Sequence, residues 1–131
     1  MLSIIEPATE AVMAEIPRAG VEEVDAAVAA AKAAFPNWRA VAPADRAALM
    51  RAIADGIEAR LDDLATLEAR NAGKPISDAT GEIGMVVETF RYYAGGPERL
   101  TGKTIPVAGG VDFTFREPLG AVGLIAPRNF P

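Results

Sequence analysis

The 131-residue chain contains no cysteine and no histidine. It can therefore form no disulfide, and it lacks the usual ligands of structural zinc and of most transition metals. A Ser-His-Asp triad is excluded because histidine is absent. Carboxylates alone could hold Mg²⁺ or Ca²⁺, but nothing in the sequence supports such a site. We therefore predict no metal site.

Positive charge and long apolar runs are also scarce. The chain has 13 Lys and Arg residues and 18 Asp and Glu residues, which gives a formal net charge of -5. No Lys/Arg cluster offers the positive footprint that nucleic-acid phosphates require. Residues 1–6 lack the features of a secretory signal, and no run approaches the roughly 18 apolar residues of a membrane span. We expect a cytoplasmic protein with no nucleic-acid and no membrane partner.

The chain does have the composition of a globular protein, with 50% hydrophobic and 24% charged residues. Short apolar stretches on either side of residues 6–10 predict a small N-terminal hairpin. Apolar residues that recur every three or four positions predict three main helices. The first begins at Val21 and is ended by Pro36, the second runs from Pro43 to Asn71, and the third runs from Ser77 to Gly95.

Large apolar side chains on these helices are the candidate core. We expect four of them to form its centre: Phe35, Ile53, Leu61 and Phe90. Trp38 is expected to pack between the first two helices. The glycine pair in residues 81–84 lies inside a helical pattern and follows no strand, so we interpret it as helix and not as a nucleotide loop. Lys74 is interpreted as an exposed cation near helix carbonyls, not as an activated amine.

Beyond residue 100 the pattern becomes that of strands. Residues 104–107 and 111–115 flank an Ala-Gly-Gly turn and predict a second hairpin. Residues 121–126 form a continuous apolar run, which is typical of a strand buried on both faces of a parallel sheet. The sequence supplies no downstream neighbours or crossover helix for such a strand. We predict an α/β fold with three main helices, short hairpins and one strand of an incomplete parallel sheet.

Five blocks of the sequence, in this order, resemble the N-terminal part of the aldehyde dehydrogenase family. They are EPATE at 6–10, AAFPNW at 33–38 with ADR at 44–46, NAGKPI at 71–76, FRYYAG at 90–95, and REPLGAVGLIAPRNFP at 116–131. The last block is the most specific, because it is similar to the family's Arg-Glu-Pro-hydrophobic-Gly run that leads into Pro-Trp-Asn-Phe-Pro. In this chain the motif reads Pro-Arg-Asn-Phe-Pro.

The resemblance implies the start of the family's fold. Residues 1–102 and 120–131 would form part of a Rossmann-like cofactor-binding domain, and residues 103–119 would form the hairpin of the oligomerisation domain. The remainder of the cofactor-binding domain and the whole catalytic domain would be absent. We expect a homo-oligomer, or association with a full-length subunit, through residues 103–119.

The resemblance also implies a chemistry, the NAD(P)-dependent oxidation of an aldehyde to a carboxylic acid. In that family a cysteine thiolate attacks the aldehyde, hydride passes to NAD⁺ or NADP⁺, and a glutamate activates the water that hydrolyses the thioester. Asn129 matches the asparagine whose amide stabilises the oxyanion. Ile125, Ala126, Pro127 and Arg128 match positions on the nicotinamide-ribose side of the cofactor. Arg128 stands where the family usually has Trp, so we expect altered binding even in a complete chain.

Several parts of that chemistry are missing from these residues. The chain has no cysteine, and the general-base glutamate and the glycine-rich cofactor segment would lie beyond Pro131. We therefore expect a truncated aldehyde dehydrogenase that is inactive as an isolated chain and binds neither NAD nor NADP appreciably. The alternative is a non-enzymatic module of helices and strands that pairs with a full-length subunit. Its discriminating feature is the strand pair 104–107 and 111–117, which would offer unpaired edges to another sheet.

Overall fold

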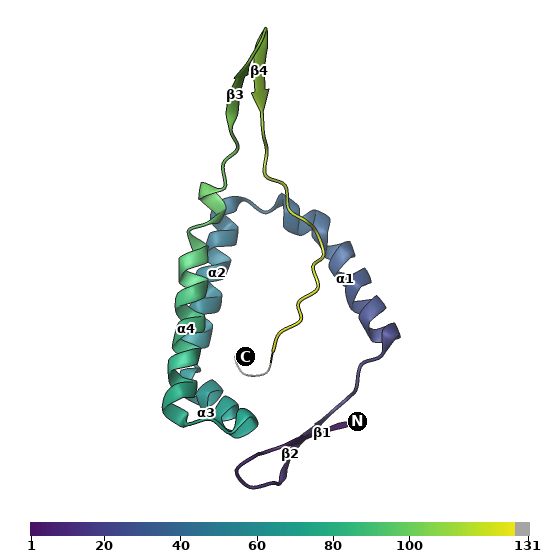
Figure 1. Cartoon of the computed structure of the whole chain (residues 1–131), viewed down its shortest axis with the longest axis vertical. Coiled ribbons are helices and arrows are strands. Elements are labelled where there is room, and N and C mark those ends of the chain that lie inside the picture. Colours follow the sequence, from purple (N-terminus) through teal and green to yellow (C-terminus); the bar gives the residue numbers. More distant parts are fainter. Residues whose placement is uncertain (128–131) are drawn as a thin grey trace.

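The computed structural model describes residues 1–127. Within them it contains four α-helices, a short 3₁₀-helix and two antiparallel two-stranded hairpins (Figure 1). The helices are α1 (Val21–Ala40), α2 (Pro43–Glu58), α3 (Leu61–Ala72), α4 (Ile76–Ala94) and η1 (Pro97–Arg99), and the strands are β1 (Leu2–Ile5), β2 (Val12–Ile16), β3 (Thr104–Val107) and β4 (Gly110–Phe113). The predicted mixture of helices and short hairpins is confirmed.

The second predicted helix is two helices in the structure, so the prediction of three main helices is wrong. α2 ends at Glu58 and α3 begins at Leu61, and Arg60 between them has φ -117° and ψ 20°, outside the helical region. The apolar spacing continues through this break, because Ile57, Leu61 and Leu64 all pack against the same buried cluster. The apolar spacing therefore does not show that the helix is interrupted, because the apolar residues before and after the turn face the same cluster.

α1 also differs from its prediction, because it passes through Pro36 and ends at Ala40. Proline removes one helical hydrogen bond, yet its fixed φ is compatible with a helix. No residue of α1 is buried, so a local distortion at Pro36 meets no packing constraint. Trp38 in the last turn is 45% exposed, which does not fit the predicted packing between the first two helices.

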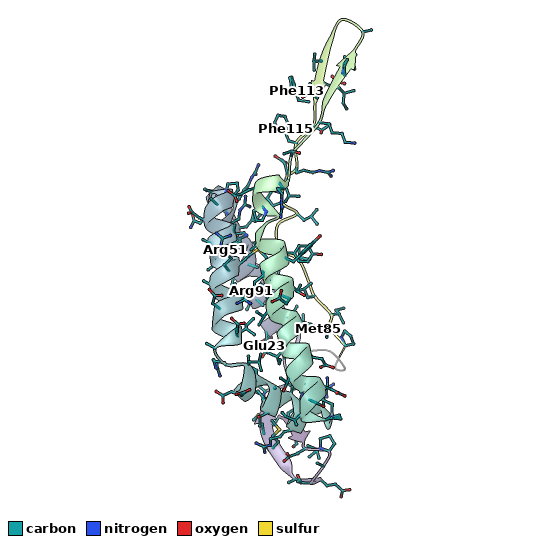
Figure 2. The ribbon with its side chains drawn as sticks, turned by 90° about the vertical axis from the view of Figure 1, so that its left-hand side faces the viewer. Glu23, Arg51, Met85, Arg91, Phe113 and Phe115 are labelled. Carbon is teal, nitrogen blue, oxygen red and sulfur yellow. The ribbon has the colours of Figure 1, made fainter. Side chains whose placement is uncertain are left out.

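The core lies where α4 packs against α2 and α3, as Figures 1 and 2 show. Most of its buried side chains are small and let the helix backbones approach closely: Ala47, Ala54, Ala65, Ala79, Ile83, Val87 and Ala94. None of the four larger side chains expected at its centre is buried: Ile53 is 38% exposed, and Phe35, Leu61 and Phe90 are half-buried. Arg91 of α4 also pairs with Glu58 and Asp55 of α2, at 2.5 and 3.3 Å.

The elements form an open arch, not a ball (Figure 1). The chain exposes 10181 Å² of accessible surface, whereas a compact monomer of 13.7 kDa exposes about 6,600 Å². α1 forms one side of the arch, the α2–α4 body forms the other, and the chain that follows β4 runs down between them. Much of the inner surface is therefore left without a covering element among the described residues.

The predicted N-terminal hairpin is confirmed, with β1 and β2 paired antiparallel. Its turn packs on the end of α3, where Glu6 accepts hydrogen bonds from Nε and Nη2 of Arg70 at 3.0 and 3.3 Å. These bonds hold the pKa of the Glu6 carboxyl below its ordinary value. Pro7 lies against Gly73, where a Cβ would come within 3.0 Å of the proline ring. Gly73 ends α3 at φ 74°, so both its backbone and its contact require glycine.

β3 and β4 form the second predicted hairpin, which projects away from the helices (Figure 1). β4 ends at Phe113, earlier than predicted, and Gly109 takes φ 80° in the turn. Both strands are exposed throughout, and each has one unpaired edge because this sheet has only two strands within residues 1–127. Phe113 and Phe115 extend into solvent along this arm (Figure 2). The assignment of residues 103–119 to an oligomerisation domain stays a prediction.

Candidate functional site

The segment 114–127 contains three of the predicted site residues and runs back from the hairpin in an extended form. The strand predicted at 121–126 is not formed, so this part of the fold prediction is wrong for the chain as it stands. Residues 118–127 make no backbone hydrogen bond to other described residues. A strand needs a neighbour to accept its ladder bonds, and no strand within residues 1–127 lies beside this segment.

The predicted cofactor-site residues are therefore in solvent. Ile125, Ala126 and Pro127 are exposed, Ile125 fully. Arg128 and Asn129 lie outside the described residues. The described structure brings none of Ile125, Ala126 and Pro127 to another functional group. The roles of all five residues stay predictions from the resemblance.

Three features fix where this segment starts. Thr114 donates its N–H to the Lys103 carbonyl at 2.9 Å, and its hydroxyl oxygen accepts the Lys103 N–H at 2.8 Å. Arg39 at the end of α1 pairs with Glu117 at 3.0 Å. Gly120 then redirects the chain with φ 94°. Together these contacts aim the segment into the space between α1 and the α2–α4 body (Figure 1).

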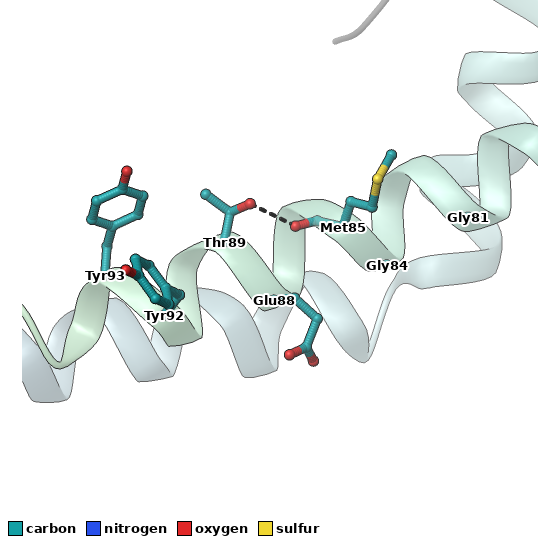
Figure 3. A pocket seen from close by; sticks show the side chains of 7 residues that line it. All are labelled: Gly81, Gly84, Met85, Glu88, Thr89, Tyr92 and Tyr93. Atoms are coloured by element: carbon teal, nitrogen blue, oxygen red, sulfur yellow. Dashed lines mark hydrogen bonds between the residues drawn. The ribbon is translucent and has the colours of Figure 1, made fainter.

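One side of α4 carries a hollow of about 570 Å³, which we call the α4 groove (Figure 3). Its lining residues recur at helical spacing: Gly81, Gly84, Met85, Glu88, Thr89, Tyr92 and Tyr93. This spacing places them on the face opposite Ile83 and Val87, which pack into the core. The hydroxyl of Thr89 donates to the Met85 carbonyl at 2.8 Å, and the rings of Tyr92 and Tyr93 meet edge to face at 5.1 Å.

The two glycines leave the floor of the α4 groove open. A Cβ at Gly81 or Gly84 would meet nothing within 4 Å, so neither glycine relieves crowding inside the described chain, and each costs the helix about 1 kcal/mol relative to alanine. Methionine and tyrosine make the walls apolar and polarisable. Such a groove suits a flat or aliphatic group. Its lining residues include no activated nucleophile.

Lys74 is not the exposed cation predicted from the sequence, because its side chain is only 14% exposed. Its ammonium lies 2.9 Å from Oε1 of Glu68 on α3 and 2.5 Å from Oε2 of Glu82 on α4. The hydrogen bonds from Lys74, first to Glu82 and then to Glu68, raise the pKa of the lysine. A protonated, ion-paired lysine is not a nucleophile. Lys74, Glu68 and Glu82 form a triad of charges that joins α3 to α4.

Sequence reasoning missed the α4 groove and the triad. The groove had a signal in the sequence, because Gly81, Gly84, Met85, Tyr92 and Tyr93 lie at i, i+3, i+4, i+11 and i+12 and form a second stripe on a helix that already has an apolar one. The triad had no such signal, because Glu68, Lys74 and Glu82 lie on either side of the turn between α3 and α4 and share no helical spacing.

Within residues 1–127 no group of three or more Asp or Glu side chains could hold a metal ion. No helix of this part is long and apolar enough to cross a membrane.

Known proteins are similar in sequence and share this arrangement of helices and strands. All residues from 1 to 131 match the model of the aldehyde dehydrogenase family. A protein of Bacillus subtilis (strain 168), DhaS, is 44% identical over 129 aligned positions, with 95% of this chain and 26% of that protein covered. Aminoaldehyde dehydrogenase 2 of Zea mays is 40% identical over 140 aligned positions, with 99% of this chain and 28% of that protein covered.

Solved structures show the same relationship. PnpE from Pseudomonas sp. WBC-3 superposes with a TM-score of 0.95 at 39% identity, over 99% of this chain and 27% of that one. Glyceraldehyde-3-phosphate dehydrogenase GapN from Methanocaldococcus jannaschii, complexed with NADP, gives 0.94 at 31% identity, over 100% of this chain and 29% of that one. The chain thus spans about a quarter of the length of its relatives and has the fold of their N-terminal part. It belongs to the aldehyde dehydrogenase family.

Proposed function

We propose that these residues supply the first part of an enzyme that oxidises an aldehyde to a carboxylic acid with NAD⁺ or NADP⁺. The observation that carries the proposal is the match of the whole chain to this family, with a TM-score of 0.95 against PnpE. PnpE has been solved with nicotinamide adenine dinucleotide and GapN with NADP, so both cofactors occur among the similar structures.

In this proposal the chain contributes a scaffold and one catalytic group. Asn129 donates its side-chain N–H to the oxyanion that forms when a thiolate attacks the aldehyde, a role whose loss costs roughly 10²–10³ in rate. Residues 125–127 and Arg128 border the nicotinamide ribose once neighbouring strands hold the segment in place. The α4 groove receives the apolar part of the aldehyde, because Met85, Tyr92 and Tyr93 give it an apolar lining.

The isolated chain is proposed to be inactive. Covalent catalysis needs a thiolate and hydrolysis needs a base, and the chain has no cysteine. Cofactor affinity is also negligible, because the proposed ribose contacts are exposed residues of an unpaired segment and supply no pocket for the phosphates or the adenosine.

A fusion tests the proposal. The chain would be joined to the part of the Zea mays aminoaldehyde dehydrogenase 2 that follows its aligned region, and NAD(P)H production would be measured over a panel of aldehydes. We expect no activity from the isolated chain and clear activity from the fusion. A fusion that folds and binds cofactor but stays inactive, beside an active parent enzyme, would contradict the proposal.

The alternative is a module that pairs with a full-length subunit. The observation in its favour is the β3–β4 hairpin, whose two outer edges are unpaired and whose apolar side chains lie in solvent. Co-purification of the chain with a full-length relative, lost when Pro replaces Val111 and Phe113, would support this function. The amides of these two β4 residues face the outer edge, because they alternate with the pairs Val107–Gly110 and Ile105–Asp112 that bond within the hairpin. The fusion assay separates the two functions. Part of an enzyme should give an active fusion, whereas a module should bind a full-length relative without being fused to it.

A further inference from the structure

A second hollow, of about 480 Å³, lies where the end of α1, the start of α2 and the segment after β4 meet. We call it the arginine pocket. Arg39, Arg46 and Arg116 line it from these three segments. Glu117 is the only acid among the described residues that line it, and it is bound by Arg39 at 3.0 Å. Three positive charges and one negative charge leave the lining with a formal charge of +2, which favours an anion.

Arg46 brings an unmet hydrogen-bond donor to this pocket. Its Nε is excluded from solvent and has no acceptor among the described residues. A buried charged donor without an acceptor is costly, so the site favours an oxygen supplied from outside. Within residues 1–127 the ion pairs involve neither Arg46 nor Arg116. No carboxylate of the described residues therefore occupies either guanidinium group.

The backbone at the start of α2 adds to the positive potential. α2 begins with Pro43 and has no side-chain cap. The first intrahelical bond is the one from Arg46 N to Ala42 O at 3.1 Å, so the amides of Ala44 and Asp45 precede it and carry the positive end of the helix dipole. The Asp45 carboxylate opposes this effect in the same turn, but it is exposed and does not line the pocket.

We propose that the arginine pocket binds a small oxyanion, a phosphate or carboxylate group, on the guanidinium groups of Arg46 and Arg116. The planar guanidinium matches both groups through paired hydrogen bonds. Three prolines in the lining, Pro43, Pro97 and Pro118, restrict the walls, so little order is lost on binding. Neither arginine is among the residues proposed for aldehyde oxidation, so the site does not depend on that reaction.

Equilibrium dialysis of the chain against radiolabelled inorganic phosphate at low ionic strength tests the proposal. Arg46→Gln is expected to weaken phosphate binding about tenfold, the loss of one charge-assisted contact. Arg116→Gln should weaken it severalfold without risk to the fold, because that residue is exposed and lies outside every helix and strand. Arg51→Gln is the matched control: Arg51 is exposed on α2 (Figure 2), lies outside the lining and should leave binding unchanged.

The outcomes are distinct. Displacement of phosphate by acetate extends the site to carboxylates, whereas retention of phosphate in excess acetate assigns it to phosphate, and either result supports the pocket. Absence of measurable phosphate binding overturns the proposal, and so does an equal loss in Arg51→Gln, which would mean a general charge effect. If circular dichroism shows that Arg46→Gln is unfolded, the comparison of Arg116→Gln with Arg51→Gln decides the matter.

Discussion

The backbone carbonyl of Thr114 lies so close to Gly102 that a Cβ on the glycine would collide with it. This contact sits beside the Lys103–Thr114 hydrogen bonds at the base of the β3–β4 arm. We expect Gly102→Ala to open these bonds at a cost of about 1–3 kcal/mol, as overpacking does. Hydrogen exchange at the Thr114 amide should speed up. Gly110→Ala, where a Cβ meets nothing within 4 Å, should leave that amide protected.

The Glu6–Arg70 contact predicts an acid-dependent release of the N-terminal hairpin. The folded pKa of Glu6 is lowered from 4.5, chiefly by the hydrogen bond from Arg70. The contact therefore stabilises the hairpin above pH 4.5 and loses that effect as the pH falls through the lowered folded value. The Met13 methyl resonance should report a transition below pH 4.5. Glu6→Gln should abolish it, and Glu10→Gln, at an exposed residue of the same turn, should retain it.

The Lys74 triad predicts a difference between two lysines. Lys74→Met leaves Glu68 and Glu82 facing each other with little solvent, so the melting temperature should fall clearly. Lys32→Met, at an exposed site on α1, should change it little. The pKa of Lys74 is raised above 10.5, so its contribution is present below pH 10.5 and is lost as the pH rises through the folded value. A Lys74→Met variant that melts like the parent would contradict this role.

The uncovered segment 118–127 predicts self-association of the isolated chain. Leu124 is 91% exposed and Ile125 fully exposed, and the chain has far more accessible surface than a compact monomer of its mass. Light scattering after size exclusion should show oligomers. Replacing Leu124 and Ile125 by Lys should shift the distribution towards monomer, whereas Ala29→Lys with Ala30→Lys on exposed α1 should not. A sharp parent monomer peak that persists on dilution would refute the prediction.

The α4 groove and Asn129 predict separable effects in the fusion enzyme. Asn129→Ala should lower kcat by about 10²–10³ with small change in KM, because the oxyanion exists only in the reaction. Gly81→Leu should raise KM for bulky aldehydes more than for acetaldehyde, since it fills the open floor of the groove. Asn71→Ala and Gly56→Leu are the controls, as both positions are exposed and lie outside the groove. Equal KM changes for small and bulky aldehydes would exclude the groove.

Local patterns in the sequence predicted most of the elements. The two hairpins follow from their turns and from alternation of apolar residues, and the helices from their three-to-four spacing. The break at Arg60 escaped prediction because Ile57 and Leu61 keep one face across it. Residues 121–126 have the composition of a buried strand, but pairing depends on chain that is distant in sequence. The role of Asn129 was predicted from the family resemblance alone. Arg46 had no signal in the sequence, because its pocket forms only where α1, α2 and the segment after β4 meet.

The core among α2, α3 and α4 consists chiefly of alanine, and no large side chain of residues 1–127 is completely buried. Alanine carries little apolar area, so unfolding of these helices adds little apolar surface to water. The heat-capacity change of unfolding scales with that area. The free energy of unfolding of the isolated chain should therefore vary only weakly with temperature, and its calorimetric transition should be broad and of low enthalpy.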